Sequence, residues 1–74
     1  MKKVLITGAN GFLGQHLTCH LKNAGFHVIA AGKGACRISK CNDVEYAQVE
    51  LTSREEVEQM LSKYSPEVII HTAA

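Results

Sequence analysis

Apolar residues recur along this chain with two different periods. Short apolar runs lie at residues 3–7, 27–31 and 67–72, the first of them rich in β-branched side chains, and each predicts a strand buried in a parallel sheet. A looser alternation of apolar and polar residues predicts a further strand over residues 44–51. Between the strands, two segments repeat apolar side chains every three or four positions, as amphipathic helices do.

The first helix is predicted over residues 12–24. Its four apolar positions are spaced by four, four and three residues and fall on one stripe: Leu13, Leu17, Leu21 and Ala24. Gly25 follows, and glycine readily adopts the left-handed conformation that commonly ends a helix.

The second helix has a signal at each end. Ser53 and Glu56 form a capping box, in which each side chain can accept a hydrogen bond from the other's backbone amide. The Ser65-Pro66 pair ends the helix, because the residue before proline avoids the helical region. The stripe between these ends consists of Val57, Met60, Leu61 and Tyr64.

These elements follow one another as strand, helix, strand, loop, strand, helix, strand, with residues 32–43 as the loop. Strands that alternate with helices indicate parallel pairing through right-handed crossovers. We therefore expect an α/β fold with strand order 3-2-1-4, half of a doubly wound Rossmann-type sheet. An edge strand as apolar as residues 68–70 is normally paired on its far side. The sequence leaves two alternatives: these residues are the N-terminal part of a larger domain, or the fourth strand completes its sheet in a homo-oligomer.

Composition excludes some classes of partner. Of the 74 residues, eight are Lys or Arg and seven are Asp or Glu, giving a net charge of +1 without long charged runs. This distribution is not typical of nucleic-acid-binding or membrane-surface proteins. Only three strongly apolar residues precede Thr7, too few for a signal peptide, and no stretch is long enough to span a bilayer. We expect a cytoplasmic protein.

The three cysteines are expected to be free thiols in a reducing compartment. Cys36 and Cys41 could join His16 or His20 around a metal ion, but their spacing matches none of the common zinc patterns. We expect no metal site.

The strongest chemical signal is a glycine-rich turn between the first strand and the first helix. Gly8, Gly11 and Gly14 are each three residues apart. The first lets the chain turn off the strand, the second lets the backbone approach a pyrophosphate, and the third lets the helix pack closely on the sheet. The free amides of Phe12 and Leu13 then face the phosphates at the positive end of the helix dipole. The turn predicts a site for a dinucleotide.

Residues 4–17 resemble the opening of the extended short-chain dehydrogenases/reductases, the NAD-dependent epimerase/dehydratase family. The family fingerprint Thr-Gly-x-x-Gly-[Phe/Tyr]-[Ile/Leu]-Gly is matched at every position of residues 7–14, with Asn10 at a variable position. The resemblance implies that Glu50 and Leu51, after the third strand, lie beside the adenine. It also implies that the ending of the fourth strand, with Ala73 and Ala74, lines the cofactor near its riboses and nicotinamide.

Within this family, two features resemble the dTDP-4-dehydrorhamnose reductase branch. The segment between the second and third strands is short and carries no helix, and residues 65–71 read Ser-Pro-Glu-Val-Ile-Ile-His. The resemblance implies a parent enzyme that reduces or epimerises a nucleotide-activated sugar.

The end of the second strand bears on the choice of cofactor. NAD-binding domains usually place an acidic residue there to bind the adenosine ribose, and this chain has Gly32. Lys33 and Arg37 follow, and either could pair with a 2′-phosphate. They could also be solvated loop charges. We expect NADP(H) to be favoured over NAD(H).

The family's catalytic Tyr-x-x-x-Lys pair is not found in these 74 residues. Tyr46 is followed four residues later by Glu50, and Tyr64 by Val68. We assign no catalytic residue here and keep three hypotheses: the NADP(H)-binding part of an enzyme, a non-catalytic dinucleotide-binding or regulatory module, and a self-associating fragment without activity.

Overall fold

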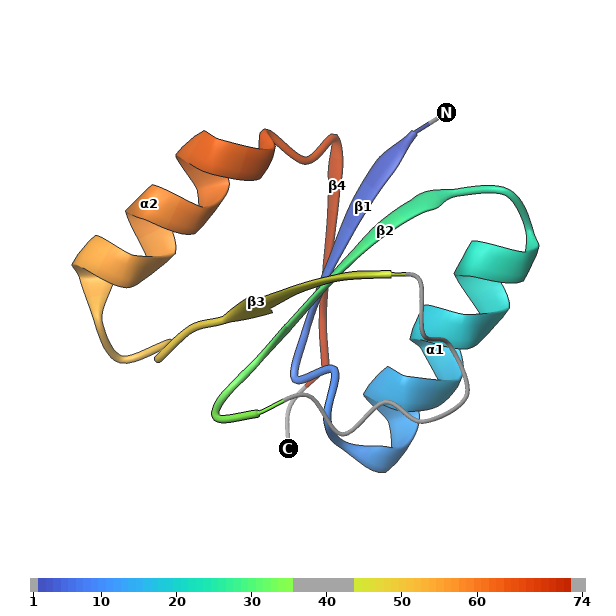
Figure 1. The fold of residues 1–74 in the computed structure, drawn as a ribbon, viewed down its shortest axis with the longest axis horizontal. Coiled ribbons are helices and arrows are strands. Elements are labelled where there is room, and N and C mark those ends of the chain that lie inside the picture. The colour runs from blue at the N-terminus through green and yellow to red at the C-terminus, as the bar shows by residue number, and fades with distance from the viewer. Residues whose placement is uncertain (1, 36–43, 73–74) are drawn as a thin grey trace.

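The computed structural model describes residues 2–35 and 44–72. Six elements follow one another in this part of the chain, in the predicted order (Figure 1). They are β1 (Lys3–Thr7), α1 (Phe12–Asn23), β2 (His27–Gly32), β3 (Glu45–Gln48), α2 (Arg54–Tyr64) and β4 (Val68–His71).

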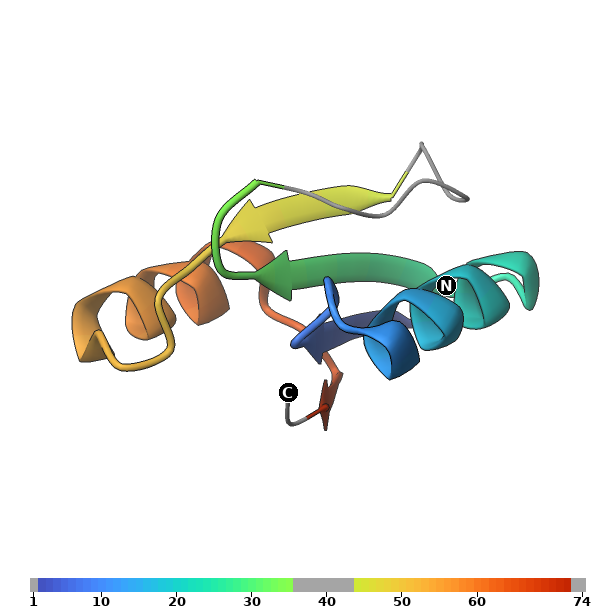
Figure 2. The same ribbon diagram turned by 90° about the horizontal axis from the view of Figure 1, so that it is seen from below.

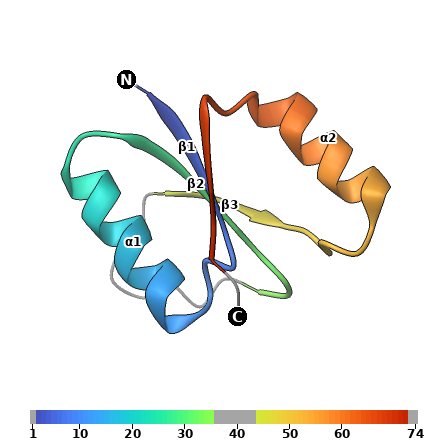
Figure 3. The same ribbon diagram turned by 180° about the vertical axis from the view of Figure 1, so that it is seen from behind.

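The four strands form one parallel sheet in the order β3-β2-β1-β4, which confirms the predicted topology (Figure 2). Leu5 on β1 lies between Ile29 on β2 and Ile69 on β4. Figure 3 shows β4 in front of the other strands, at one edge of the sheet. All four carboxyl ends therefore meet at the same side of the molecule.

Alternate side chains of the strands enter two separate cores, one under each helix. Val4, Ile6 and Val28 belong to the cluster beneath α1, whereas Leu5 and Ile29 belong to the cluster beneath α2. The two helices accordingly cover opposite faces of the sheet (Figure 1). This two-sided burial explains why β1 and β2 are nearly continuous apolar runs.

The packed line of α1 differs from the predicted stripe. Gly14 and Thr18 are the buried residues of the helix, while Leu13 is 60% exposed and Ala24 is also exposed. Leu17 and Leu21 flank that line and pack on the core. Gly14 has no side chain, so α1 approaches the sheet through it, and the flanking leucines fill the space on either side.

The end of α1 confirms the predicted glycine stop. Gly25 has φ +98°, and its amide donates to the Lys22 carbonyl at 3.0 Å. The Phe26 amide donates to the Leu21 carbonyl at 3.1 Å, which completes a Schellman motif. Ala24 is the C-cap of the helix and not part of it.

Helix α2 confirms the predicted stripe but only half of the capping box. The Ser53 hydroxyl accepts from the Glu56 amide at 3.4 Å, yet the Glu56 carboxylate accepts from the Glu50 amide at 3.1 Å and not from Ser53. The predicted apolar residues face the second core: Val57, Met60, Leu61 and Tyr64. The helix ends at Tyr64, and its C-cap Ser65, before Pro66, takes the left-handed conformation with φ 46°.

Strands β3 and β4 are shorter than predicted, and β2 is one residue longer. Hydrogen bonds nevertheless continue past the strand ends. The Thr72 amide donates to the Thr7 carbonyl at 3.2 Å, and the Glu67 amide donates to the Lys3 carbonyl at 3.0 Å. The Val49 amide donates to the Gly32 carbonyl at 2.9 Å. After Val49 the chain turns toward α2, so the predicted strand over residues 44–51 stops early.

Candidate functional site

A groove of about 650 Å³ runs along the carboxyl edge of the sheet. Every strand contributes to it through its last residue or the segment that follows, and such crevices are where open α/β sheets bind ligands. The groove is lined by Gly8, Asn10, Gly11, Gly32, Lys33, Gly34, Val49, Glu50, Leu51, His71 and Thr72.

Two of the three turn glycines are required by packing within the chain. Gly8 has φ +67°, and a Cβ atom there would overlap the backbone oxygen of Thr72. The Thr72 hydroxyl also donates to the carbonyls of Thr7 at 2.5 Å and Gly8 at 3.1 Å, which joins β4 to the turn. A Cβ atom at Gly14 would overlap the backbone oxygen of Gly8.

Gly11 is different. It has φ −73°, which any residue adopts, and a Cβ atom there would meet only the Gly8 oxygen at 3.4 Å, an ordinary contact. The fold therefore does not require glycine at this position. Gly11 is also the N-cap of α1 and supplies no side chain to the first helical amides. Its bare backbone, just before those amides, lies at the groove.

Side chains brace the turn from both sides. The Gln15 amide donates to the Asn10 carbonyl at 2.7 Å. At the edge of β4, the Thr7 hydroxyl and the His71 Nδ1 atom are 2.5 Å apart, and His71 lines the groove.

An ion pair crosses the groove between the segments that follow β2 and β3. The Lys33 Nζ atom lies 3.5 Å from the Glu50 Oε2 atom, and 84% of the Lys33 side chain is exposed. The pKa of the Glu50 carboxyl is lowered from its ordinary value, chiefly by a hydrogen bond from the Thr52 backbone and next by the Lys33 charge. Since Lys33 is held so loosely, it stays accessible to an anion.

Of the nine predicted binding residues that the structure describes, six meet in this groove: Gly8, Asn10, Gly11, Lys33, Glu50 and Leu51. Gly14 packs against the turn backbone, and the side chains of Phe12 and Leu13 are 83% and 60% exposed; these three residues do not line the groove. Arg37, Ala73 and Ala74 lie outside the described residues, as do Cys36 and Cys41 of the considered metal site.

The sequence interpretation missed Gly34, Val49 and Thr72 as lining residues. Each follows the end of a strand, so the general rule that ligands bind at carboxyl ends of parallel strands could have found them. It also missed Tyr46, whose hydroxyl donates to the Gly34 carbonyl at 2.7 Å.

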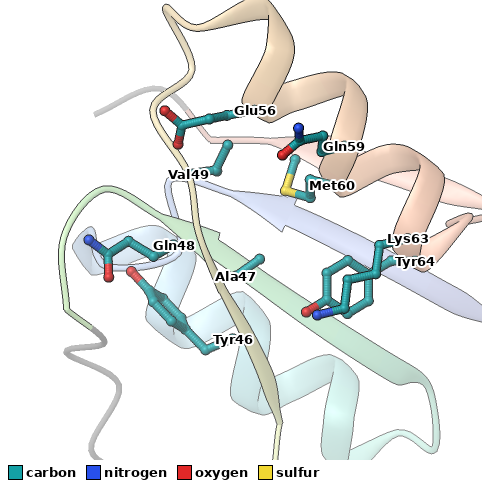
Figure 4. A pocket seen from close by; sticks show the side chains of 9 residues that line it. All are labelled: Tyr46, Ala47, Gln48, Val49, Glu56, Gln59, Met60, Lys63 and Tyr64. Atoms are coloured by element: carbon teal, nitrogen blue, oxygen red, sulfur yellow. The ribbon is translucent and has the colours of Figure 1, made fainter.

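A second, smaller hollow of about 310 Å³ lies between β3 and α2 (Figure 4). Its walls come from β3 with the following Val49 and from α2, with Gln59, Met60 and Lys63 on the helix side. It has neither a glycine turn nor a meeting of strand ends, so the groove is the better candidate site.

Within residues 2–35 and 44–72, no group of three or more His, Cys, Asp or Glu side chains could hold a metal ion. The helices described in the same ranges include none that is both long and apolar enough to cross a bilayer.

Known proteins are similar to this chain in sequence and in fold. The profile of the NAD dependent epimerase/dehydratase family matches residues 4–74. The beta subunit of methionine adenosyltransferase 2 from Rattus norvegicus is 32% identical over 73 residues, covering 99% of this chain and 20% of its own length. Spore coat polysaccharide biosynthesis protein SpsK from Bacillus subtilis (strain 168) is 34% identical over 74 residues, covering 100% of this chain and 22% of its own length.

Among solved structures, the UDP-glucose 4-epimerase of Thermus thermophilus in complex with NAD superimposes with a TM-score of 0.86 at 30% identity. The match covers 97% of this chain and 24% of the epimerase chain. The chain thus spans about a fifth to a quarter of the length of these proteins.

Proposed function

The chain belongs to the NAD-dependent epimerase/dehydratase family, and we propose that it is the NADP(H)-binding part of an enzyme acting on a nucleotide-activated sugar. In this proposal residues 1–74 are the N-terminal part of the dinucleotide-binding domain. The nicotinamide of the bound cofactor supplies the hydride chemistry, and the residues of this chain bind and orient the cofactor.

The main support for the proposal is the glycine at position 11. Packing within the chain accounts for glycine at positions 8 and 14 but not at position 11. The fold does not require glycine at position 11, yet glycine stands there, at the N-cap of α1 and in the groove. The absence of a side chain at such a place indicates a ligand whose phosphates approach the backbone. The backbone amides of Phe12 and Leu13 would donate to those phosphates.

The remaining roles follow the position of each residue around the groove. Glu50 and Leu51 would lie beside the adenine, and Ala73 and Ala74 near the riboses and nicotinamide. Asn10 would hold the turn in place through its backbone bond from Gln15.

The preference for NADP(H) is supported by the end of β2. Gly32 supplies no carboxylate for a ribose hydroxyl, and Lys33, 84% exposed, can pair with a 2′-phosphate. Arg37 would add a second positive charge. A competition titration tests this preference, and NADH binding at least as tightly as NADPH would contradict it.

Substitution of Gly11 tests dinucleotide binding itself. Gly11→Ala should weaken NADPH binding at least about tenfold, a loss of about 1.4 kcal/mol, because the methyl group blocks the approach of the pyrophosphate. Thermal unfolding should change little, since the new Cβ makes only an ordinary contact. Isothermal calorimetry and circular dichroism measure the two quantities.

Gly25→Ala is the matched control, because Gly25 lies outside the groove and requires its positive φ. This variant should lose stability and keep its affinity for NADPH. Equal affinities for the wild-type protein and Gly11→Ala would contradict the proposed site.

A nucleotide-activated sugar, for example a dTDP-4-dehydro sugar, is the proposed substrate class. The family match and the likeness to a UDP-glucose 4-epimerase support this substrate class. Because residues 1–74 lack the Tyr-x-x-x-Lys pair, the test uses a longer protein that contains them together with that pair. Such a protein should oxidise NADPH in the presence of nucleotide-activated sugars and not in the presence of the free sugars. Free thiols and a cytoplasmic dinucleotide pool make the cytoplasm the expected compartment.

A non-catalytic module is the second candidate, favoured by the relative whose name describes it as a subunit of methionine adenosyltransferase 2. That candidate predicts that a longer protein containing these residues binds NADPH but turns over no nucleotide-activated sugar.

A further inference from the structure

Two side chains hold the backbone that follows β2. The Asn10 side-chain amide, on the glycine turn, donates to the Tyr46 hydroxyl, on β3, at 2.9 Å. The Tyr46 hydroxyl donates to the Gly34 carbonyl at 2.7 Å. The same Asn10 nitrogen lies 3.3 Å from the carbonyl oxygen of Lys33 and 3.2 Å from that of Ala35. Residues 33–35 are thus fixed by side chains from two other segments.

The hydrogen-bonding capacity of these groups makes them act together. A primary amide has two hydrogens, and among the described residues three oxygens lie within reach of the Asn10 nitrogen, with the Tyr46 hydroxyl the nearest of the three. Without that hydroxyl, the Gly34 carbonyl loses its donor and the Asn10 amide loses its nearest acceptor. The partly buried position of the pair strengthens both bonds relative to solvent.

The pair also fills the space in front of Gly32. A Cβ atom at position 32 would lie 2.7 Å from the Asn10 Nδ2 atom and 2.9 Å from the Tyr46 hydroxyl oxygen. An acidic side chain at the end of β2 would therefore displace the Asn10 and Tyr46 side chains from this arrangement. The chain has the pair in place of the acid, and the pair fixes the backbone that carries Lys33.

We propose that Asn10 and Tyr46 are positioning residues that set the preference for the 2′-phosphate of the cofactor. They occupy the volume of a ribose-binding acid and hold residues 33–35 so that the Lys33 ammonium reaches the 2′-position. This inference rests on the proposed NADP(H) function and adds to it the residues that determine the choice between the two dinucleotides.

Tyr46→Phe separates this role from packing. The phenyl ring keeps the contacts of Tyr46 with the core under α1, and only the hydroxyl is lost. Figure 4 shows Tyr46 pointing away from α2, whereas Tyr64 projects from α2 itself. Tyr64→Phe is the matched control, because it removes the hydroxyl of a partly buried tyrosine that lies on α2 and packs on the other core.

The experiment measures the dissociation constants of NADPH and NADH by calorimetry for the wild-type protein and both variants. Tyr46→Phe should weaken NADPH binding about three- to tenfold, the effect of one or two hydrogen bonds, and leave NADH binding within about twofold. Tyr64→Phe should leave both constants unchanged. Asn10→Ala should change the ratio of the NADPH and NADH dissociation constants in the same direction as Tyr46→Phe. The double variant should change that ratio little further, because both residues act through one network.

Equal weakening of NADPH and NADH in Tyr46→Phe would overturn the inference and make the pair a purely structural feature, with the proposed function intact. An unchanged ratio in both single variants would overturn it as well. A folded wild-type protein that binds neither dinucleotide would instead overturn the proposed function.

Discussion

The carboxyl of Glu50 faces two groups that favour its ionised form. The Thr52 backbone is the larger influence and the Lys33 ammonium the second, and together they hold the pKa below the ordinary value of 4.5. A lowered pKa means that folding favours the carboxylate. The contribution to stability is therefore present above the pKa of the unfolded chain and is lost as the pH falls through the lowered value.

Replacing Lys33 tests how this shift is divided. In Lys33→Met the pKa of Glu50 should rise, but it should stay below 4.5, because the Thr52 hydrogen bond remains. A carboxyl carbon titration by NMR measures the value directly. Lys63→Met, a lysine on α2 outside the groove, is the control and should leave Glu50 unaffected. A complete return to 4.5 would show that the ion pair outweighs the backbone bond.

Single residues of the site were predicted from the sequence unevenly. The spacing of Gly8, Gly11 and Gly14 was sufficient to place the turn. It could not show that Thr72 and the turn backbone impose two of the glycines while the third is free of such contacts. Tyr46 was missed because its partners lie on a distant turn and a neighbouring loop, and no local pattern encodes such a contact.

At the scale of elements, both helices are followed by a residue with positive φ, but the two residues are of different types. Gly25 after α1 and Ser65 after α2 both have positive φ, +98° and 46°. Glycine bears this conformation without strain, whereas a side chain costs about 1–2 kcal/mol. Nothing lies within 4 Å of a Cβ atom at Gly25, so a substitution there costs only the strain of the backbone conformation.

Opposite substitutions at these ends should therefore have opposite effects. Gly25→Ala should lower the free energy of unfolding by about 1 kcal/mol. Ser65→Gly should raise it by about 0.5 kcal/mol, less than the strain removed, because glycine also gains entropy in the unfolded chain. Urea unfolding measures both. A loss of stability in Ser65→Gly would mean that the serine hydroxyl, 3.4 Å from the Ser62 carbonyl, matters more than backbone strain.

Periodicity predicted where the helices and strands lie, but it was only half right about the packed face of α1. Leu17 and Leu21 pack on the core as predicted, whereas Leu13 and Ala24 are exposed. The predicted stripe counted only large apolar residues, and the buried line runs through Gly14 and Thr18. Close approach of a helix through small residues is invisible to a hydrophobic pattern. For α2 no such approach occurs, and its stripe was predicted correctly.

At the scale of the whole molecule, the topology explains why the site lies where it does. Strand order 3-2-1-4 places β1 at the centre, with its carboxyl end between those of β2 and β4. The glycine turn after β1 therefore contacts Lys33 and Thr72, which are far apart in sequence. The alternation of strands and helices was sufficient to predict this arrangement, because few topologies satisfy parallel pairing with right-handed crossovers.

The edge of the sheet at β4 exposes apolar side chains. Val68 and Ile69 are 38% and 52% exposed, and β4 has β1 as its neighbour on one side only. An apolar edge with unpaired backbone groups promotes pairing with another chain. We expect this chain, studied alone, to self-associate through β4.

Ile69→Lys tests that expectation, because a charge on an edge strand disfavours pairing with a second copy. Analytical ultracentrifugation should show concentration-dependent association of the wild-type chain and a monomer for the variant. Leu13→Lys is the control, since Leu13 is 60% exposed on α1, away from the edge, and its variant should associate as the wild-type chain does. If Ile69→Lys associates as strongly as the wild-type chain, the contact between copies lies elsewhere and β4 is not the surface through which they meet.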